Sequence, residues 1–81
     1  MNESNFISEL LKYGIDPSII CFNNNVKDDV FCVRDNYNVV EVFYRERGKE
    51  YDIQKFQNRE LALEYLLNKI LRMSGKKETD K

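Results

Sequence analysis

The chain has 81 residues, of which 42% are hydrophobic and 33% are charged, and its formal net charge is −1. A chain of this length predicts one domain with one small core, which leaves too little material for a deep, walled active-site cavity. Because acidic and basic residues nearly balance, the overall charge provides no attraction for nucleic acid or for an anionic membrane.

The sequence also bears on the compartment in which the protein works. No apolar run approaches the roughly 20 residues that a membrane-spanning helix needs. The polar start, Met1 to Asn5, lacks the basic and apolar segments of a secretory signal. We therefore expect a cytoplasmic protein with no membrane partner. In that compartment Cys21 and Cys32 are expected to be reduced and buried as small hydrophobic side chains.

The first predicted element is a helix from Asn2 to Tyr13. Its apolar side chains recur at helical spacing and form one stripe: Phe6, Ile7, Leu10 and Leu11. Gly14 is a helix stop signal, and Pro17 cannot continue the helix. Residues 18–22 form a short apolar run that is either a strand or an extended entry to the sheet, and Asn23 to Asn25 break it.

Three strands are predicted next, because β-branched and aromatic residues dominate the segments Val30–Arg34, Val39–Arg45 and Glu50–Phe56. The connections between them are short, and connections of two to five residues join antiparallel neighbours. We therefore expect an antiparallel meander of three strands, or of four if residues 18–22 join it.

The last element is a helix that starts after Asn58, a good N-cap residue, and runs to Met73. Its apolar face follows helical spacing: Leu63, Leu66, Leu67 and Ile70. The predicted fold is an α+β two-layer sandwich of helix, three- or four-stranded antiparallel meander and helix. Both helices lie on one sheet face and leave the other face to solvent. Residues 1–75 form this single domain, and residues 76–81 form a disordered polar tail.

Residues typical of catalysis are missing. The sequence has no histidine, its three glycines stand apart, and no metal-ligand spacing is present. Asp28 and Asp29 are adjacent, so along a strand their side chains point to opposite faces and cannot act as a carboxylate pair. We expect a protein that is not an enzyme and needs no cofactor or metal.

The charged segment from Arg45 to Glu50 has two interpretations. It is a hairpin turn, with Gly48 at the position that requires positive φ. It is also an exposed polar surface suited to a partner. Phe43 lies between Glu41 and Arg45 on the outer sheet face, and an aromatic side chain surrounded by charges is typical of an interface anchor.

The segments "VEVFYRERG" (40–48) and "YDIQKFQNRELALEYLL" (51–67) resemble small immunity proteins of bacterial polymorphic or contact-dependent growth inhibition toxin systems. The opening helix that ends in "YGIDPS" fits the same pattern, and the resemblance covers residues 6–71. It implies a cytoplasmic protein that binds one cognate toxin, often a nuclease, and blocks its active site or partner surface. The Glu46-Arg47-Gly48 turn is the part of the motif that carries over.

Nuclease active sites are basic because they hold phosphate, so an inhibitor can match them with carboxylates. The candidate toxin-binding residues lie on or beside the charged hairpin: Asp28, Asp29, Glu41, Phe43, Glu46, Arg47, Glu50 and Asp52.

Two other classes of function stay open. The first is an interaction or regulatory module without a toxin, either a monomer or a weak homodimer. In that case Leu61 and Tyr65 either pack on the first helix or form a small patch for self-association. The second is a double-stranded RNA-binding domain, which shares the helix–strands–helix layout. Two glutamates and one arginine in residues 58–64 would repel phosphates, so we expect no nucleic-acid partner.

Overall fold

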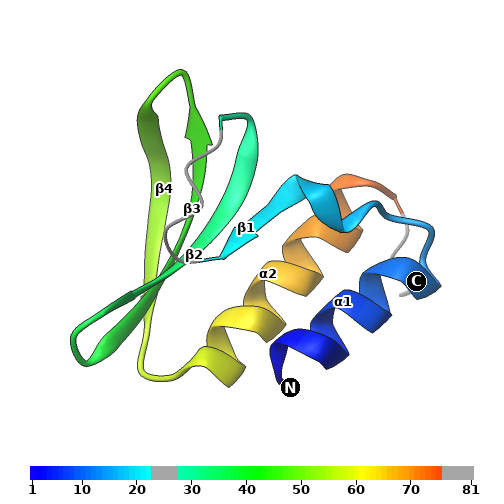
Figure 1. The fold of residues 1–81 in the computed structure, drawn as a ribbon, viewed down its shortest axis with the longest axis horizontal. Coiled ribbons are helices and arrows are strands. Elements are labelled where there is room, and N and C mark those ends of the chain that lie inside the picture. The colour runs from blue at the N-terminus through cyan, green and yellow to red at the C-terminus, as the bar shows by residue number, and fades with distance from the viewer. Residues whose placement is uncertain (23–27, 76–81) are drawn as a thin grey trace.

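The computed structural model describes residues 1–22 and 28–75, whose two α-helices and four-stranded sheet confirm the predicted α+β class (Figure 1). The elements in chain order are α1 (Glu3–Lys12), a 3₁₀ helix η1 (Pro17–Ile19), β1 (Ile20–Phe22), β2 (Val30–Asn36), β3 (Val39–Glu46), β4 (Lys49–Phe56) and α2 (Arg59–Met73).

Both α-helices begin at asparagine caps, and the cap predicted at Asn58 is confirmed. The Asn2 side chain accepts a 2.8 Å hydrogen bond from the Asn5 N–H, and the Asn58 side chain accepts a 2.9 Å bond from the Leu61 N–H. Each cap satisfies a backbone donor that the first helical turn leaves without a partner. These caps fix the start of α1 and of α2.

The sheet has the order β1-β2-β3-β4 and is mixed, which corrects the predicted antiparallel meander. The β2–β3 and β3–β4 pairs are antiparallel, but β1 runs parallel to β2, with Cys21 opposite Cys32. The prediction relied on short connections, whereas residues 23–29 separate β1 from β2. At about 3.3 Å per residue, that length can return the chain to the start of a strand of only three residues.

Two tight hairpins join the antiparallel strands. Tyr37 and Asn38 connect β2 to β3, and Arg47 and Gly48 connect β3 to β4. Arg47 and Gly48 have φ values of +54° and +78°, which is the left-handed pair that a two-residue turn matching the strand twist requires. The positive φ predicted for Gly48 is confirmed.

A β-bulge interrupts the β3–β4 ladder. Val42 pairs with Gln54 and Tyr44 pairs with Tyr51, so two residues of β4 stand opposite Phe43 alone. Asp52 is one of these two and has a φ of +55°. The extra residue changes which side chains of β4 point to each face, and a bulge of this kind also bends the edge strand.

The main core lies between the helices and one face of the sheet. Figure 1 shows α1 and α2 side by side on the same side of the sheet. The largest fully buried side chains come from both helices and from β2 and β3: Phe6, Leu10, Val33, Val42, Leu63 and Leu66. The two-layer sandwich stays a prediction, while the α+β class is confirmed.

A second buried cluster lies on the opposite sheet face and consists of Cys21, Val30, Cys32 and Phe43. Val30 and Cys32 alternate with core residues along β2, so their side chains point away from the main core. The expectation that this face is left entirely to solvent is therefore wrong for these four residues, each less than 9% exposed.

Two predicted features lie outside the described residues, namely the chain break at Asn23 to Asn25 and the polar tail at 76–81. Within the ranges 1–22 and 28–75, no helix is long and apolar enough to cross a membrane.

Candidate functional site

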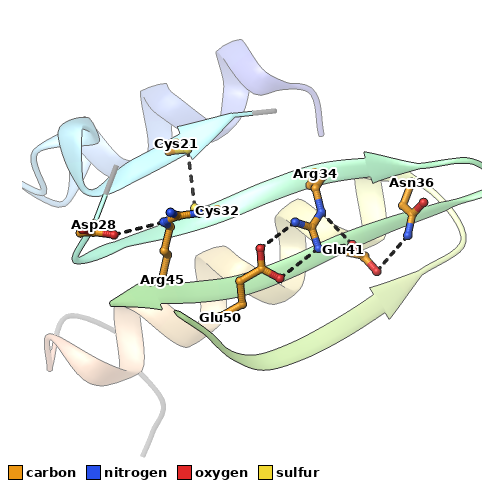
Figure 2. Close-up of polar contacts among 8 residues, drawn as sticks. All are labelled: Cys21, Asp28, Cys32, Arg34, Asn36, Glu41, Arg45 and Glu50. Carbon is orange, nitrogen blue, oxygen red and sulfur yellow. Dashed lines mark hydrogen bonds and ion pairs between the residues drawn. The ribbon is translucent and has the colours of Figure 1, made fainter. Parts of the chain in front are cut away.

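The sheet face opposite the main core, called here the outer face, carries a network of charged side chains from three strands (Figure 2). Arg34 of β2 is its centre. The Arg34 guanidinium donates to a Glu41 carboxylate oxygen from Nε at 2.9 Å and from Nη2 at 2.7 Å. It also donates to Glu50 from Nη1 at 2.8 Å and from Nη2 at 3.2 Å. One guanidinium thus ties β2, β3 and β4 together.

The register of the sheet explains this geometry. Arg34 stands directly opposite Glu41 in the β2–β3 ladder, and directly opposed residues share one face. Glu50 comes from β4 and lies opposite Arg45, and the Arg34 side chain reaches it diagonally across β3. Charge-assisted bonds to two carboxylates at once hold the planar guanidinium in a single orientation.

Phe43 lies beneath this network. Its ring centroid is 4.5 Å from the Arg34 guanidinium carbon, and its side chain belongs to the second buried cluster with 4% exposure. The prediction placed Phe43 on the correct face but expected an exposed anchor. That expectation is wrong, because the guanidinium covers the ring and Cys32 packs beside it in the same cluster.

Glu41 is also buried, with 4% exposure, and it remains charged because its oxygens have donors. The hydrogen bond from Arg34 lowers the pKa of the Glu41 carboxyl, and the Asn36 amide, 3.2 Å from Oε2, lowers it further against the opposing effect of burial. In turn, the hydrogen bonds to Glu50 and Glu41 raise the pKa of Arg34. Glu41 therefore supports the outer face from within rather than presenting a carboxylate at the surface.

Asp28 connects the start of β2 to the β3–β4 hairpin. One oxygen, Oδ1, accepts from the Gly48 N–H at 3.0 Å and from Arg45 Nε at 3.1 Å. The Gly48 bond is the largest cause that lowers the pKa of the Asp28 carboxyl, followed by the Arg45 bond. The Asp28 carboxylate therefore holds the β3–β4 turn against the start of β2.

Asp52 lies apart from the other predicted contact residues. Its carboxylate forms an ion pair with Lys69 of α2 and accepts a 2.9 Å bond from Gln54. The Lys69 hydrogen bond is the main cause that lowers the pKa of the Asp52 carboxyl. The bulge turns Asp52 toward α2, so the structure does not bring it together with the outer-face network.

Asp29 and Glu46 form what we call the acidic corner. The Asp29 N–H donates to the Arg45 carbonyl at 2.6 Å, which places Asp29 beside the end of β3. Burial raises the pKa of the Tyr44 hydroxyl, and the charges of Asp29 and Glu46 raise it further. Both carboxylates therefore lie near Tyr44, which packs against the main core, so the acidic corner is at the hairpin end on the helix side of the sheet; both residues are exposed. Within residues 1–22 and 28–75, neither side chain forms an ion pair or hydrogen bond.

Arg47 is exposed at the tip of the β3–β4 hairpin, as the prediction requires. The eight predicted contact residues therefore divide into three sets. Phe43, Glu41 and Glu50 meet around Arg34; Asp28, Asp29, Glu46 and Arg47 gather at the hairpin end of the sheet; Asp52 faces α2. The sequence interpretation missed Arg34 and Asn36, although the alternation along β2 assigns both to the outer face.

An apolar depression of about 250 Å³ lies elsewhere, lined by Ile19, Phe31, Ile70, Met73 and Ser74. Its one polar side chain, Ser74, already donates to the Ile70 carbonyl at 2.7 Å. The depression therefore lacks the convergent polar groups that orient a small ligand.

Compared with protein-family models, with curated proteins and with solved structures, the chain has no match. The case for a function rests on the sequence resemblance and on the geometry of the outer face.

Proposed function

We propose that the protein binds and neutralises a cognate bacterial toxin in the cytoplasm, through its outer face and the adjoining hairpin end of the sheet. The supporting observation is a sheet face that neither described α-helix covers and that presents charged side chains in fixed positions (Figures 1 and 2). Within it, Arg34 and Glu50 keep 36% and 28% of their side-chain surface exposed. The resemblance of residues 40–48 and 51–67 to immunity proteins supplies the class of partner.

Fixed side chains favour binding because they lose little conformational freedom when a partner arrives. Arg34, held by two carboxylates over an aromatic ring, is already oriented. In this proposal Glu41 and Phe43 support the surface from below, while Glu50 and Arg34 meet the partner. Glu41 and Phe43 thus have a supporting role and Glu50 a contact role, a distinction that the sequence alone does not make.

The acidic corner provides the charge that a basic toxin surface would meet. Asp29 and Glu46 form no ion pair among the described residues, although Lys49 stands opposite Glu46 in the β3–β4 ladder, whereas Asp28, Glu41, Glu50 and Asp52 each form one. Complementary charge across an interface speeds association and suppresses wrong partners. A nuclease that binds phosphate with lysine and arginine side chains is the class of toxin that such a corner fits.

The proposal is tested by co-expression with the polypeptide encoded beside this chain's gene. We expect that polypeptide alone to arrest growth, and this chain to restore growth and to co-purify with it in equal amounts. A neighbouring product that is harmless, or that arrests growth with or without this chain, would contradict the proposal. A nuclease assay on the purified pair then distinguishes active-site blockade from binding elsewhere.

A second candidate is a homodimeric interaction module. It is favoured by the exposed apolar side chains Leu61, Tyr51 and Ile53, which are 46%, 47% and 42% exposed. Tyr65, in contrast, packs against Phe56 with ring centroids 5.1 Å apart and ring planes tilted by 42°, so it is not part of an open patch with Leu61. The mass in solution separates the two candidates, because a stable homodimer without the toxin favours the module.

RNA binding receives no support from α2. Arg59 is the basic residue of its first turn, and it donates to Glu3 at 2.7 Å and to Asp35 at 2.8 Å. Because two carboxylates neutralise this guanidinium, it would attract a phosphate group only weakly.

A further inference from the structure

Cys21 and Cys32 lie directly opposite each other in the parallel β1–β2 pair. Their sulfur atoms are 3.5 Å apart, and each residue is 3% exposed (Figure 2). Both thiols are reduced in the structure. The proposed toxin-binding function uses neither of them, so their juxtaposition calls for a separate explanation.

The strand pairing is compatible with one requirement of a disulfide, the separation of the two Cα atoms. Neighbouring strands lie about 4.8 Å apart, within the Cα–Cα separation of roughly 4.4–6.8 Å that disulfides span. Closing the sulfur–sulfur distance to about 2.05 Å requires side-chain rotation and no change of strand register. We propose that Cys21 and Cys32 are a reversible dithiol–disulfide site that takes a small-molecule disulfide, such as oxidised glutathione, as its oxidant.

The reaction proceeds by two thiol–disulfide exchanges. The thiolate of one cysteine attacks the small disulfide, whose sulfur–sulfur bond breaks, and one small thiol leaves. The second cysteine then attacks the protein-bound sulfur of this mixed disulfide, forming the Cys21–Cys32 bond and releasing the second small thiol. The protein loses two electrons and two protons, and the oxidant gains both.

The order of attack follows from the fold. Burial raises the pKa of the Cys32 thiol to about 12, so Cys32 is a poor first nucleophile. Cys21 belongs to a strand of three residues at the edge of the sheet, where local opening requires the fewest broken contacts. We assign the first attack to Cys21 during such an opening, and the second to Cys32 before β1 closes again, while solvent still reaches its thiol.

The disulfide would link the edge strand β1 covalently to β2. Cys32 lies opposite Phe43 in the β2–β3 ladder, so the bond would also stiffen the cluster that supports Arg34. This inference does not depend on the proposed function, because it concerns the redox state of the isolated chain.

The test is a redox equilibrium on the intact protein in buffers of fixed reduced-to-oxidised glutathione ratio, with acid quenching, thiol alkylation and mass spectrometry. The same titration is repeated in denaturing urea. We expect an intramolecular disulfide, seen as a loss of two hydrogens and two alkylation sites. Its equilibrium constant should be at least tenfold larger in the native protein than in urea, because the fold holds the sulfurs together.

An equilibrium constant that is smaller in the native protein than in urea would overturn the proposal, since the fold would then oppose the bond. Native protein that stops at a single glutathione adduct would overturn it as well. The matched controls are Cys21→Ser and Cys32→Ser, each of which should give only the adduct. Thermal unfolding provides a readout that needs no variant: the oxidised chain should melt roughly 10 °C higher than the reduced chain.

Discussion

Arg34 lies over Phe43, with the guanidinium carbon 4.5 Å from the ring centroid, while the same guanidinium bonds to Glu41 and Glu50. A buried apolar cluster and a charged surface therefore share one side chain. The cation contributes to the fold by covering the aromatic ring and by neutralising a buried carboxylate. It contributes to the proposed binding surface with the part that remains exposed.

Replacing Arg34 tests this double role. Arg34→Met keeps much of the apolar contact with Phe43 but leaves the buried Glu41 without its cation, and unpaired buried charges are costly. We expect the free energy of unfolding to fall by about 2 kcal/mol, as measured by urea denaturation. The double variant Arg34→Met/Glu41→Met should recover most of the loss.

The matched control is Arg47→Met, which removes an exposed cation from the hairpin tip and should change stability by less than about 0.5 kcal/mol.

The stability that the Glu41–Arg34 pair contributes depends on pH, and the lowered pKa of the Glu41 carboxyl sets the direction of this dependence. Its pairing stabilises the fold above the pKa of the unfolded chain and is lost as the pH falls through the lower folded pKa. The difference between wild type and Arg34→Met should therefore shrink in acid, and a difference independent of pH would contradict the ion-pair account.

The β3–β4 hairpin gives a prediction about backbone conformation. A Cβ atom added at Gly48 would meet no heavy atom within 4 Å, but the φ of +78° disfavours any L side chain. Gly48→Ala should therefore cost about 1 kcal/mol through the backbone alone. The N–H that donates to Asp28 is retained in this variant.

The companion change is Arg47→Asn, because asparagine tolerates the left-handed region better than arginine. We expect it to stabilise the protein by roughly 0.5 kcal/mol in the same denaturation experiment. Equal stabilities for Gly48→Ala and the wild type would show that the turn adopts another conformation in solution.

The buried thiol of Cys32 predicts a loss of stability in alkali. Its pKa rises from 9.0 to about 12 in the folded protein. Above pH 9.0 the unfolded chain loses this proton while the folded chain keeps it, so unfolding becomes easier as the pH rises toward 12. The slope is at most about 1.4 kcal/mol per pH unit.

Comparison with Cys32→Ser isolates this contribution, since serine does not titrate in that range and the lysines and tyrosines are common to both chains. Under a phosphine reductant, the stability advantage of the wild type should narrow from pH 9 to pH 11. An advantage that stays constant would mean that Cys32 titrates as it does in the unfolded chain.

Much of the fold follows from local signals. The cap at Asn58 and the positive φ at Gly48 are each set by one residue and its neighbours, and both are predicted correctly. The parallel placement of β1 could not be predicted in the same way. It depends on where the chain returns after residues 23–29, and no turn residue dictates that path.

The site was harder to predict, because its key relationships depend on register. Once Tyr37 and Asn38 are known to be a two-residue loop, Arg34 must lie opposite Glu41. The predicted strands end at Arg34 and begin again at Val39, which leaves four residues between them and the register open. The bulge at Asp52 also changes which β4 side chains point to each face of the sheet. The alternation of side chains shifts by one residue where a strand gains an extra residue, so it cannot be counted along the sequence.

The most direct test of the account is the association rate of this chain with the polypeptide encoded beside its gene, at low and physiological salt. The variant Asp29→Lys/Glu46→Lys reverses the acidic corner, and Glu9→Lys/Glu64→Lys makes the same change of net charge on the helices. We predict that the first pair slows association at least tenfold and flattens its salt dependence, while the second pair changes the rate less than threefold. Equal effects of the two pairs, or no effect of the first, would contradict binding through the hairpin end of the sheet.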